Sequence, residues 1–238
     1  MQTVGIVIAA AVLLVSLATP CGMSGSDAGV LFEPAVLYWA FENPSNLRPP
    51  RTSFDPLIRR LASRNNLDWR LVLAIIETES HFREQAVSPK GAKGLMQLMP
   101  VVARTHGVVA PFEREENLSA GIRHFAWLQR KIKGRTPADA LKLSLAAYNS
   151  GIGHLRDAQN LAIAKGKKPR AWKNVRPMYL LLEEKDAQAN AKHGYCKGSE
   201  TVDYVAKVLR RYEKYRNRYP AHSIVLTRSD SKPKNPKA

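Results

Sequence analysis

The chain has 238 residues, 45% of them hydrophobic, so it can bury one substantial core but scarcely two. Its net charge of +17 points to an anionic partner. Two cysteines and six scattered histidines show no ligand spacing, so we expect no metal site and no cofactor.

An uncharged apolar run, Val4 to Ala18, lies at the start of the chain. It is short for a bilayer span but typical of a signal-peptide core. Residues 1–22 are therefore predicted to be a signal peptide or an N-terminal membrane anchor of an exported, periplasmic protein. Because no Lys or Arg precedes the run, an uncleaved anchor or a misplaced start codon stays open, as does a buried N-terminal helix.

The two cysteines allow more than one arrangement. Cys21 directly follows the apolar run, where a lipidated cysteine would tether the protein to a membrane, but Ala18-Thr19-Pro20-Cys21 is a poor lipidation signal. Cys196 could pair with Cys21, and the alternative that we favour is a small buried thiol.

The rest of the chain is organised around one helical domain. Residues 23–52 are predicted to be a linker with a packed apolar segment, Val36 to Phe41, and residues 220–238 a basic, disordered tail. Between them, residues 53–219 show helix signals and no convincing strand, so the fold class is mainly α. The expected helices run from Ser53 or Asp55 through Leu61, from an Asp68 cap to Glu79, from Asn117 to Ile132, from Thr136 to Tyr148, and over Gly153–Lys165, Ala171–Glu184 and Glu200–Tyr219.

Glu79 is the candidate catalytic residue. It shares one helical stripe with four apolar residues, Val72, Ile75, Ile76 and Phe82. Burial and the negative end of the helix dipole both favour the protonated form of its carboxyl group, which could then act as a general acid. The alternative is a partly exposed glutamate paired with Arg83. Glu77 points about 200° away and is expected to be solvated.

A glycine-punctuated loop, Ser88 to Pro100, follows Glu79. Gly91 and Gly94 permit positive φ and let a ligand approach the backbone, while Ser88 and Gln97 offer hydrogen bonds. Apolar walls would come from Leu95, Met96, Leu98 and Met99. Each residue alone also fits an ordinary turn, but the combination predicts a substrate cleft beside the acid.

Two later motifs carry further candidates. Gly151 is expected to end a helix and leave the Tyr148 ring and the Asn149 amide free to face a cleft. Glu200 is expected to begin a helix, with Tyr204 one turn later on the same face. On their own these patterns also fit a core aromatic residue and ordinary helix caps.

Together these segments resemble the signature motifs of the lytic murein transglycosylases of the soluble-transglycosylase (SLT) type. The motifs are Glu79–Pro100, Ala146–Gly151 and Gly194–Val205, and the resemblance covers roughly Asp55 to Tyr219. Within the family, the stretch between the last two motifs is similar to the catalytic domain of membrane-bound lytic murein transglycosylase F.

The resemblance implies a single lysozyme-like catalytic domain that cleaves peptidoglycan. Glu79 would protonate the oxygen between N-acetylmuramic acid and N-acetylglucosamine, and then act as the base that closes a 1,6-anhydro ring. The absence of an evident second catalytic carboxylate suits such substrate-assisted cleavage. The residues expected to bind substrate are Ser88, Gly94, Met96, Gln97, Tyr148, Asn149, Glu200 and Tyr204.

Alternatives remain at this stage. A hydrolytic muramidase resembling goose-type lysozyme would use the same acid and admit water, and a non-catalytic scaffold would only bind the cell wall. The basic clusters, such as Arg210-Arg211, lack a nucleic-acid motif, so we expect peptidoglycan and no nucleic acid as the partner. We expect a monomer, and a partner protein from the cell wall or a secretion machinery stays open.

Overall fold

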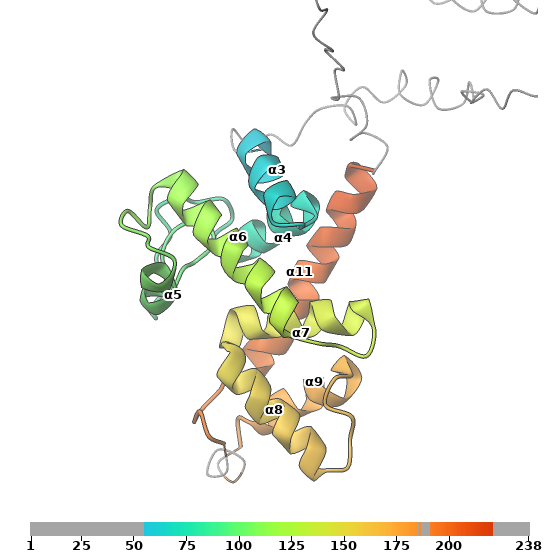
Figure 1. Cartoon of the computed structure of the whole chain (residues 1–238). Coiled ribbons are helices and arrows are strands. Elements are labelled where there is room, and N and C mark those ends of the chain that lie inside the picture. Colours follow the sequence, from blue (N-terminus) through green and yellow to red (C-terminus); the bar gives the residue numbers. More distant parts are fainter. Residues whose placement is uncertain (1–54, 185, 187–190, 221–238) are drawn as a thin grey trace, which may run out of the picture. The chain divides into compact units, whose positions relative to one another are not determined.

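The structure is a computed structural model and describes residues 55–184, 186 and 191–220 (Figure 1). The predicted signal peptide or anchor (1–22), the linker (23–52) with its apolar segment, Cys21 and the tail from residue 221 onward lie outside these residues.

The described residues are mainly helical, as predicted, and contain isolated β-bridges but no strand. None of their helices is both long and apolar enough to cross a lipid bilayer. The helices are α3 (Asp55–Arg64), α4 (Trp69–Glu79), α5 (Pro100–Thr105), α6 (Arg114–Lys131), α7 (Pro137–Ser150), α8 (Ile152–Ala164), α9 (Trp172–Leu181) and α11 (Gly198–Arg218).

Local sequence signals fix several helix boundaries. The Asp68 side chain accepts a hydrogen bond from the Arg70 amide and caps α4, as predicted. Thr136 caps α7 in the same way, with Pro137 at the first helical position. The predicted start of α6 at Asn117 is wrong, because Glu113 caps this helix and Asn117 lies buried inside it. A cap was inferred where the polar side chain instead serves a tertiary contact.

The centre of the domain is the packing of α11 on α4. Figure 1 shows α11 running past α4 and α7 toward the side of the molecule where α3 lies. The buried face of α4 includes Ile75 and Ile76, both fully buried, and α11 covers it with Val205 and Val208. Burial of such side chains contributes about 1.5–3 kcal/mol each, so α4 is held firmly as a platform for the residues at its end.

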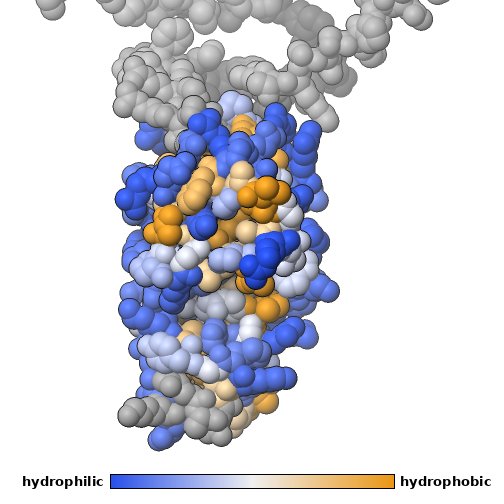
Figure 2. Space-filling view, turned by 90° about the vertical axis from the view of Figure 1, so that its left-hand side faces the viewer, coloured by the Kyte–Doolittle hydropathy of each residue, from blue (hydrophilic) through white to orange (hydrophobic). Residues whose placement is uncertain are grey.

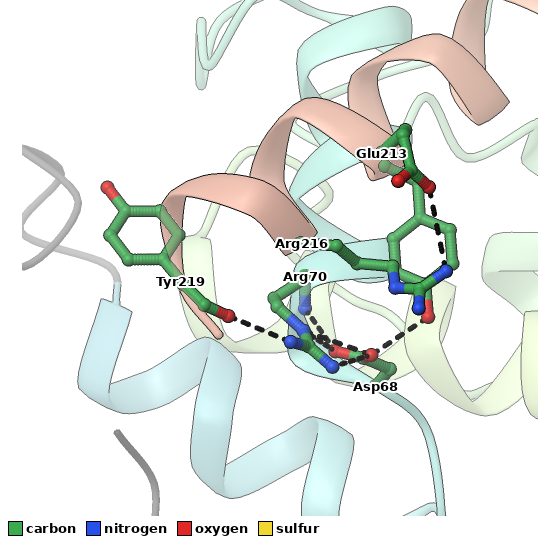
Figure 3. A network of polar contacts seen from close by, with 6 residues as sticks. Asp68, Arg70, Glu213, Arg216 and Tyr219 are labelled. Atoms are coloured by element: carbon green, nitrogen blue, oxygen red, sulfur yellow. Dashed lines mark hydrogen bonds and ion pairs between the residues drawn. The ribbon is translucent and has the colours of Figure 1, made fainter. Parts of the chain in front are cut away.

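A polar network ties the start of α4 to the last turns of α11 (Figure 3). The Arg70 guanidinium donates to the Asp68 carboxylate at 2.6 Å and to the Tyr219 carbonyl oxygen at 2.8 Å, and the Tyr212 hydroxyl donates to the same carboxylate at 2.8 Å. Arg216 and Glu213 form an ion pair at 3.5 Å on the outer side of this network. These contacts fix the register of α11 relative to α4.

Glu77, expected to be solvated, is instead half-buried. Its carboxylate pairs with the Arg211 Nε atom at 3.3 Å, on the side of α4 that faces α11. The helical rotation that separates Glu77 from Glu79 was correct, but the spacing could not reveal that α11 covers both directions.

Candidate active site

A cleft of about 810 Å³ opens beside the C-terminal end of α4. Its walls come from the loop after α4, from α6, from the junction of α7 and α8, and from the segment that leads into α11. Glu79 lies in this cleft together with five of the residues expected to bind substrate, namely Ser88, Gln97, Tyr148, Asn149 and Glu200.

Glu79 is the last residue of α4, and the cleft walls remove most water from its carboxyl group. This desolvation raises its pKa from 4.5 to about 7, although the hydrogen bond from the Tyr204 hydroxyl, 2.7 Å from Oε1, acts in the opposite direction. Within the described residues no ion pair joins Glu79 to Arg83, whose Nε atom instead donates to the Ser80 carbonyl oxygen. The carboxyl group is therefore poised between its two protonation states near neutral pH.

The chain turns sharply after Glu79. His81 and Phe82 both adopt positive φ angles, 51° and 62°, which are uncommon for residues with side chains. The predicted stripe therefore ends at Glu79, and Phe82 packs against the core from outside the helix. This turn leads the loop back over the end of α4.

Asn117 holds that loop in place from within α6. Its side-chain oxygen accepts from the Met96 amide at 2.9 Å, and its side-chain nitrogen donates to the carbonyl oxygens of Lys93 and Pro111 at 3.0 and 2.7 Å. Gly94, at φ 77°, lies against this amide so closely that a Cβ atom would overlap both Asn117 and the Pro111 oxygen. Glycine is therefore required at position 94 because Asn117 and Pro111 pack against the loop there, and not because a ligand approaches the backbone.

Gly94 and Met96 are buried behind the cleft wall and do not line the cleft. The Met96 side chain fills the space above Gly121, and its carbonyl oxygen accepts from the Tyr148 hydroxyl at 2.9 Å. These two residues therefore support the cleft wall and were expected, wrongly, to lie in the cleft. Sequence spacing could not distinguish residues that line the cleft from residues packed behind them.

Ser88 and Gln97 line the cleft from the loop. The Ser88 hydroxyl oxygen accepts from the Ala92 amide at 3.0 Å, which leaves the hydroxyl proton free to donate. The Gln97 side-chain nitrogen donates to the carbonyl oxygens of Ala86 and Gly94 at 3.1 and 2.9 Å, so its oxygen remains as an acceptor.

Tyr148 and Asn149 lie in the last turn of α7, which Gly151 ends at φ 89°, as predicted. The Asn149 side-chain oxygen accepts from the Thr201 hydroxyl at 2.9 Å, which leaves its NH₂ group as a donor in the cleft. Burial raises the pKa of Tyr148 well above its ordinary value, so this tyrosine stays neutral.

Glu200 and Tyr204 share the first turns of α11 but have different environments. Tyr204 is buried and contacts Glu79, whereas the Glu200 side chain lines the cleft with 52% of its surface exposed and lies 3.9 Å from the Lys197 ammonium group. Cys196 is a buried free thiol that also borders the cleft, in agreement with the favoured alternative.

Several cleft residues were not singled out by sequence reasoning, among them His124 and Trp127 of α6 and His154 of α8. The only available signal was an aromatic residue on the mainly polar side of α6. Within residues 55–184, 186 and 191–220, no three His, Cys, Asp or Glu side chains group together in a way that could hold a metal ion.

Comparison with known proteins finds a family match for part of this domain. Residues 56–171 match the family profile described as "Transglycosylase SLT domain". The fold is lysozyme-like, and the lytic transglycosylase Slt of Pseudomonas aeruginosa, solved as an inactive mutant, superimposes with a TM-score of 0.51. That match has 21% sequence identity and covers 77% of this chain and 28% of the other, so it bears on the fold alone.

Several curated relatives share one name. A protein of Desulfosudis oleivorans named membrane-bound lytic murein transglycosylase F is 39% identical over 167 residues, which cover 70% of this chain and 36% of the relative. A protein of the same name from Marinobacter nauticus is 38% identical and is covered to 33%. The chain therefore spans about a third of the length of these relatives.

Proposed function

We propose that this domain is a peptidoglycan lytic transglycosylase. It cleaves the β-1,4 bond between N-acetylmuramic acid and N-acetylglucosamine and leaves a 1,6-anhydromuramoyl end. The observation that carries the proposal is the carboxyl group of Glu79, which lines the cleft with a pKa raised to about 7. The family match and the named relatives support the substrate.

Glu79 acts first as an acid. Tyr204 occupies its Oε1 atom, and within the described part of the chain Oε2 has no hydrogen-bond partner, so we assign proton transfer to Oε2. The proton moves from Glu79 to the leaving oxygen as the glycosidic bond breaks. The acetamido carbonyl of the substrate stabilises the positive charge that develops on the anomeric carbon.

Glu79 then acts as a base. It takes the proton of the muramoyl 6-hydroxyl group while that oxygen bonds to the anomeric carbon, which closes the ring and restores the acid. A group with a pKa of about 7 serves both steps, since neither protonation state is strongly disfavoured near neutral pH.

The free polar groups of the cleft orient the sugar. Among the described residues, the Ser88 hydroxyl and the Asn149 amide have no acceptor for their protons, and both suit the acetamido carbonyl or the ring hydroxyls. Glu200, exposed at the cleft edge, binds sugar hydroxyls or the amide groups of the peptide stem. Tyr204 positions Glu79, and Tyr148 positions the loop through the Met96 carbonyl oxygen.

The location of the protein is part of the proposal. Peptidoglycan lies outside the cytoplasmic membrane, and the relatives are named membrane-bound, so we propose an exported, periplasmic monomer tethered through its N-terminal region. The intact mass of the protein isolated from cells shows whether this region is cleaved, lipidated or retained.

Product mass tests the reaction. Digestion of purified sacculi should release muropeptides that are one water lighter than those made by a hydrolytic muramidase. Products of hydrolytic mass would replace the transglycosylase by a muramidase. Binding to sacculi without release of fragments, where a known lysozyme works, would instead indicate a scaffold.

A further inference from the structure

One wall of the cleft is apolar, and the sequence motifs account only for its Met99. The Trp127 side chain of α6 lines the cleft with 37% of the residue exposed. Met99 and Val101, at the start of α5, line the same cleft and are 39% and 59% exposed. Figure 2 views the molecule from the side of α5 and shows hydrophobic groups at the surface among hydrophilic ones.

The Trp127 ring has a built support. His124 stacks against it with ring centroids 5.8 Å apart and an interplanar angle of 19°, and His106 packs edge-on against His124 at 5.5 Å. Burial lowers the pKa of His124 to about 4, so the supporting ring is uncharged near neutral pH. The near-parallel His124 ring holds the orientation of the indole, and part of the indole stays exposed in the cleft.

The position of this wall relative to the acid follows from a chain of ring contacts. His124 also lies 5.8 Å from the ring of Tyr148, whose hydroxyl group anchors the loop beside Glu79. Trp127 is therefore linked to Tyr148 through His124, and all three residues line the same cleft as Glu79. A ligand in this cleft can reach both Glu79 and Trp127.

We propose that Trp127, Met99 and Val101 form a sugar-stacking platform, which binds a ring of the glycan strand away from the bond that is cut. The inference rests on the proposed function, because it assigns a second contact to the same strand. The C–H face of a pyranose ring is apolar and flat, and an indole supported from behind presents a matching surface with little conformational entropy to lose. The patch lies inside the cleft that holds the acid, which favours the strand over a partner protein.

The test measures glycan binding without cleavage. In the Glu79→Gln protein, peptide-free glycan strands from peptidoglycan, separated by length, are titrated by calorimetry and by tryptophan fluorescence. Adding Trp127→Ala should weaken the binding of long strands about tenfold, with little effect on the shortest strand that still binds. Trp127→Phe should keep most of the affinity but lose the fluorescence change that long strands produce.

The matched control is Leu180→Ala. Leu180 is 43% exposed and lies outside the cleft, so its truncation should leave the affinity unchanged. Equal affinity of the Trp127→Ala and parent proteins for strands of every length would overturn the platform, as would a fluorescence change that persists in Trp127→Phe. If the platform is overturned in this way but wild-type protein still releases anhydro products, the proposed reaction is retained without the platform. Absence of strand binding by the Glu79→Gln protein would overturn the platform, and absence of products from wild-type protein would overturn the reaction.

Discussion

The two ends of α4 carry carboxyl groups whose pKa values are shifted in opposite directions. Both groups accept a hydrogen bond from a tyrosine of α11. Tyr212 donates to Asp68 at 2.8 Å and Tyr204 donates to Glu79 at 2.7 Å. Burial alone would raise the pKa of Asp68, but hydrogen bonds from the Arg70 side chain and amide outweigh it and lower this pKa below 3.8. The pKa of Glu79 rises to about 7.

The two pKa shifts differ because only Asp68 has a neighbouring cation and because the two groups lie at opposite ends of the helix. Arg70 holds Asp68 at the positive end of the α4 dipole, whereas no cation within the described residues pairs with Glu79 at the negative end. A tyrosine hydroxyl is common to both sites, so it cannot by itself decide the charge. One helix thus keeps a structural anion at its start and a carboxyl group with a raised pKa at its end.

The largest expected effect comes from replacing each carboxyl group by its amide. Glu79→Gln should reduce release of anhydromuropeptides from sacculi about a thousandfold, because the amide cannot donate the proton. Asp68→Asn is the matched control and should keep activity per folded molecule within about twofold. Similar losses in both variants would mean that the activity assay reports the fold and not the acid.

Asp68→Asn should instead reduce stability. It weakens a charge-assisted pair with Arg70 whose side chains are only 12% and 24% exposed. We expect a loss of about 2–3 kcal/mol in the free energy of unfolding, measured by urea denaturation at pH 7. An unchanged midpoint would show that the network in Figure 3 contributes nothing net.

Glu79→Gln should have the reverse effect on stability, and the gain should depend on pH. The folded-state pKa of about 7 lies above the ordinary 4.5, so folding favours the protonated form. This contribution is complete below about pH 4.5 and is lost as the pH rises through 7. At pH 9 the variant should be about 1–2 kcal/mol more stable than wild type, which allows for partial solvent access, and at pH 4 the two should agree. A constant difference across this range would contradict the raised pKa.

Tyr204→Phe gives the smallest expected change. The Tyr204 hydroxyl lowers the pKa of Glu79, so its removal should raise that pKa above about 7. The alkaline limb of kcat/KM on soluble glycan strands, set by loss of the acid's proton, should then move to higher pH. Tyr212→Phe, the corresponding change at Asp68, should leave the pH profile in place. A downward shift for Tyr204→Phe would show that the hydroxyl stabilises the acid form.

The predictable parts of the site are those set by neighbours along the chain. The Asp68 cap, the apolar stripe that leads to Glu79 and the stop at Gly151 follow from helix periodicity and capping, and all three were predicted. Glu79 could be proposed as an acid because it continues the apolar stripe of α4 and lies at the C-terminal end of this helix. The family motifs added the order of the later elements.

The rest depends on contacts across the chain. Asn117 was expected to cap a helix, but it serves as a buried support for a loop more than twenty residues earlier in the sequence. Met96 was expected in the cleft and lies behind it, and Trp127 was not singled out at all. Spacing along a helix shows which residues share a face, but not which partner that face will meet.

The most direct test of the account is an NMR titration of the protein with labelled glutamate carboxyl carbons, in which Glu79 is assigned by its absence from Glu79→Gln. The account predicts a midpoint of about 7 for Glu79. A midpoint near the ordinary 4.5 would contradict it, because the cleft would then hold a carboxylate with no proton to give.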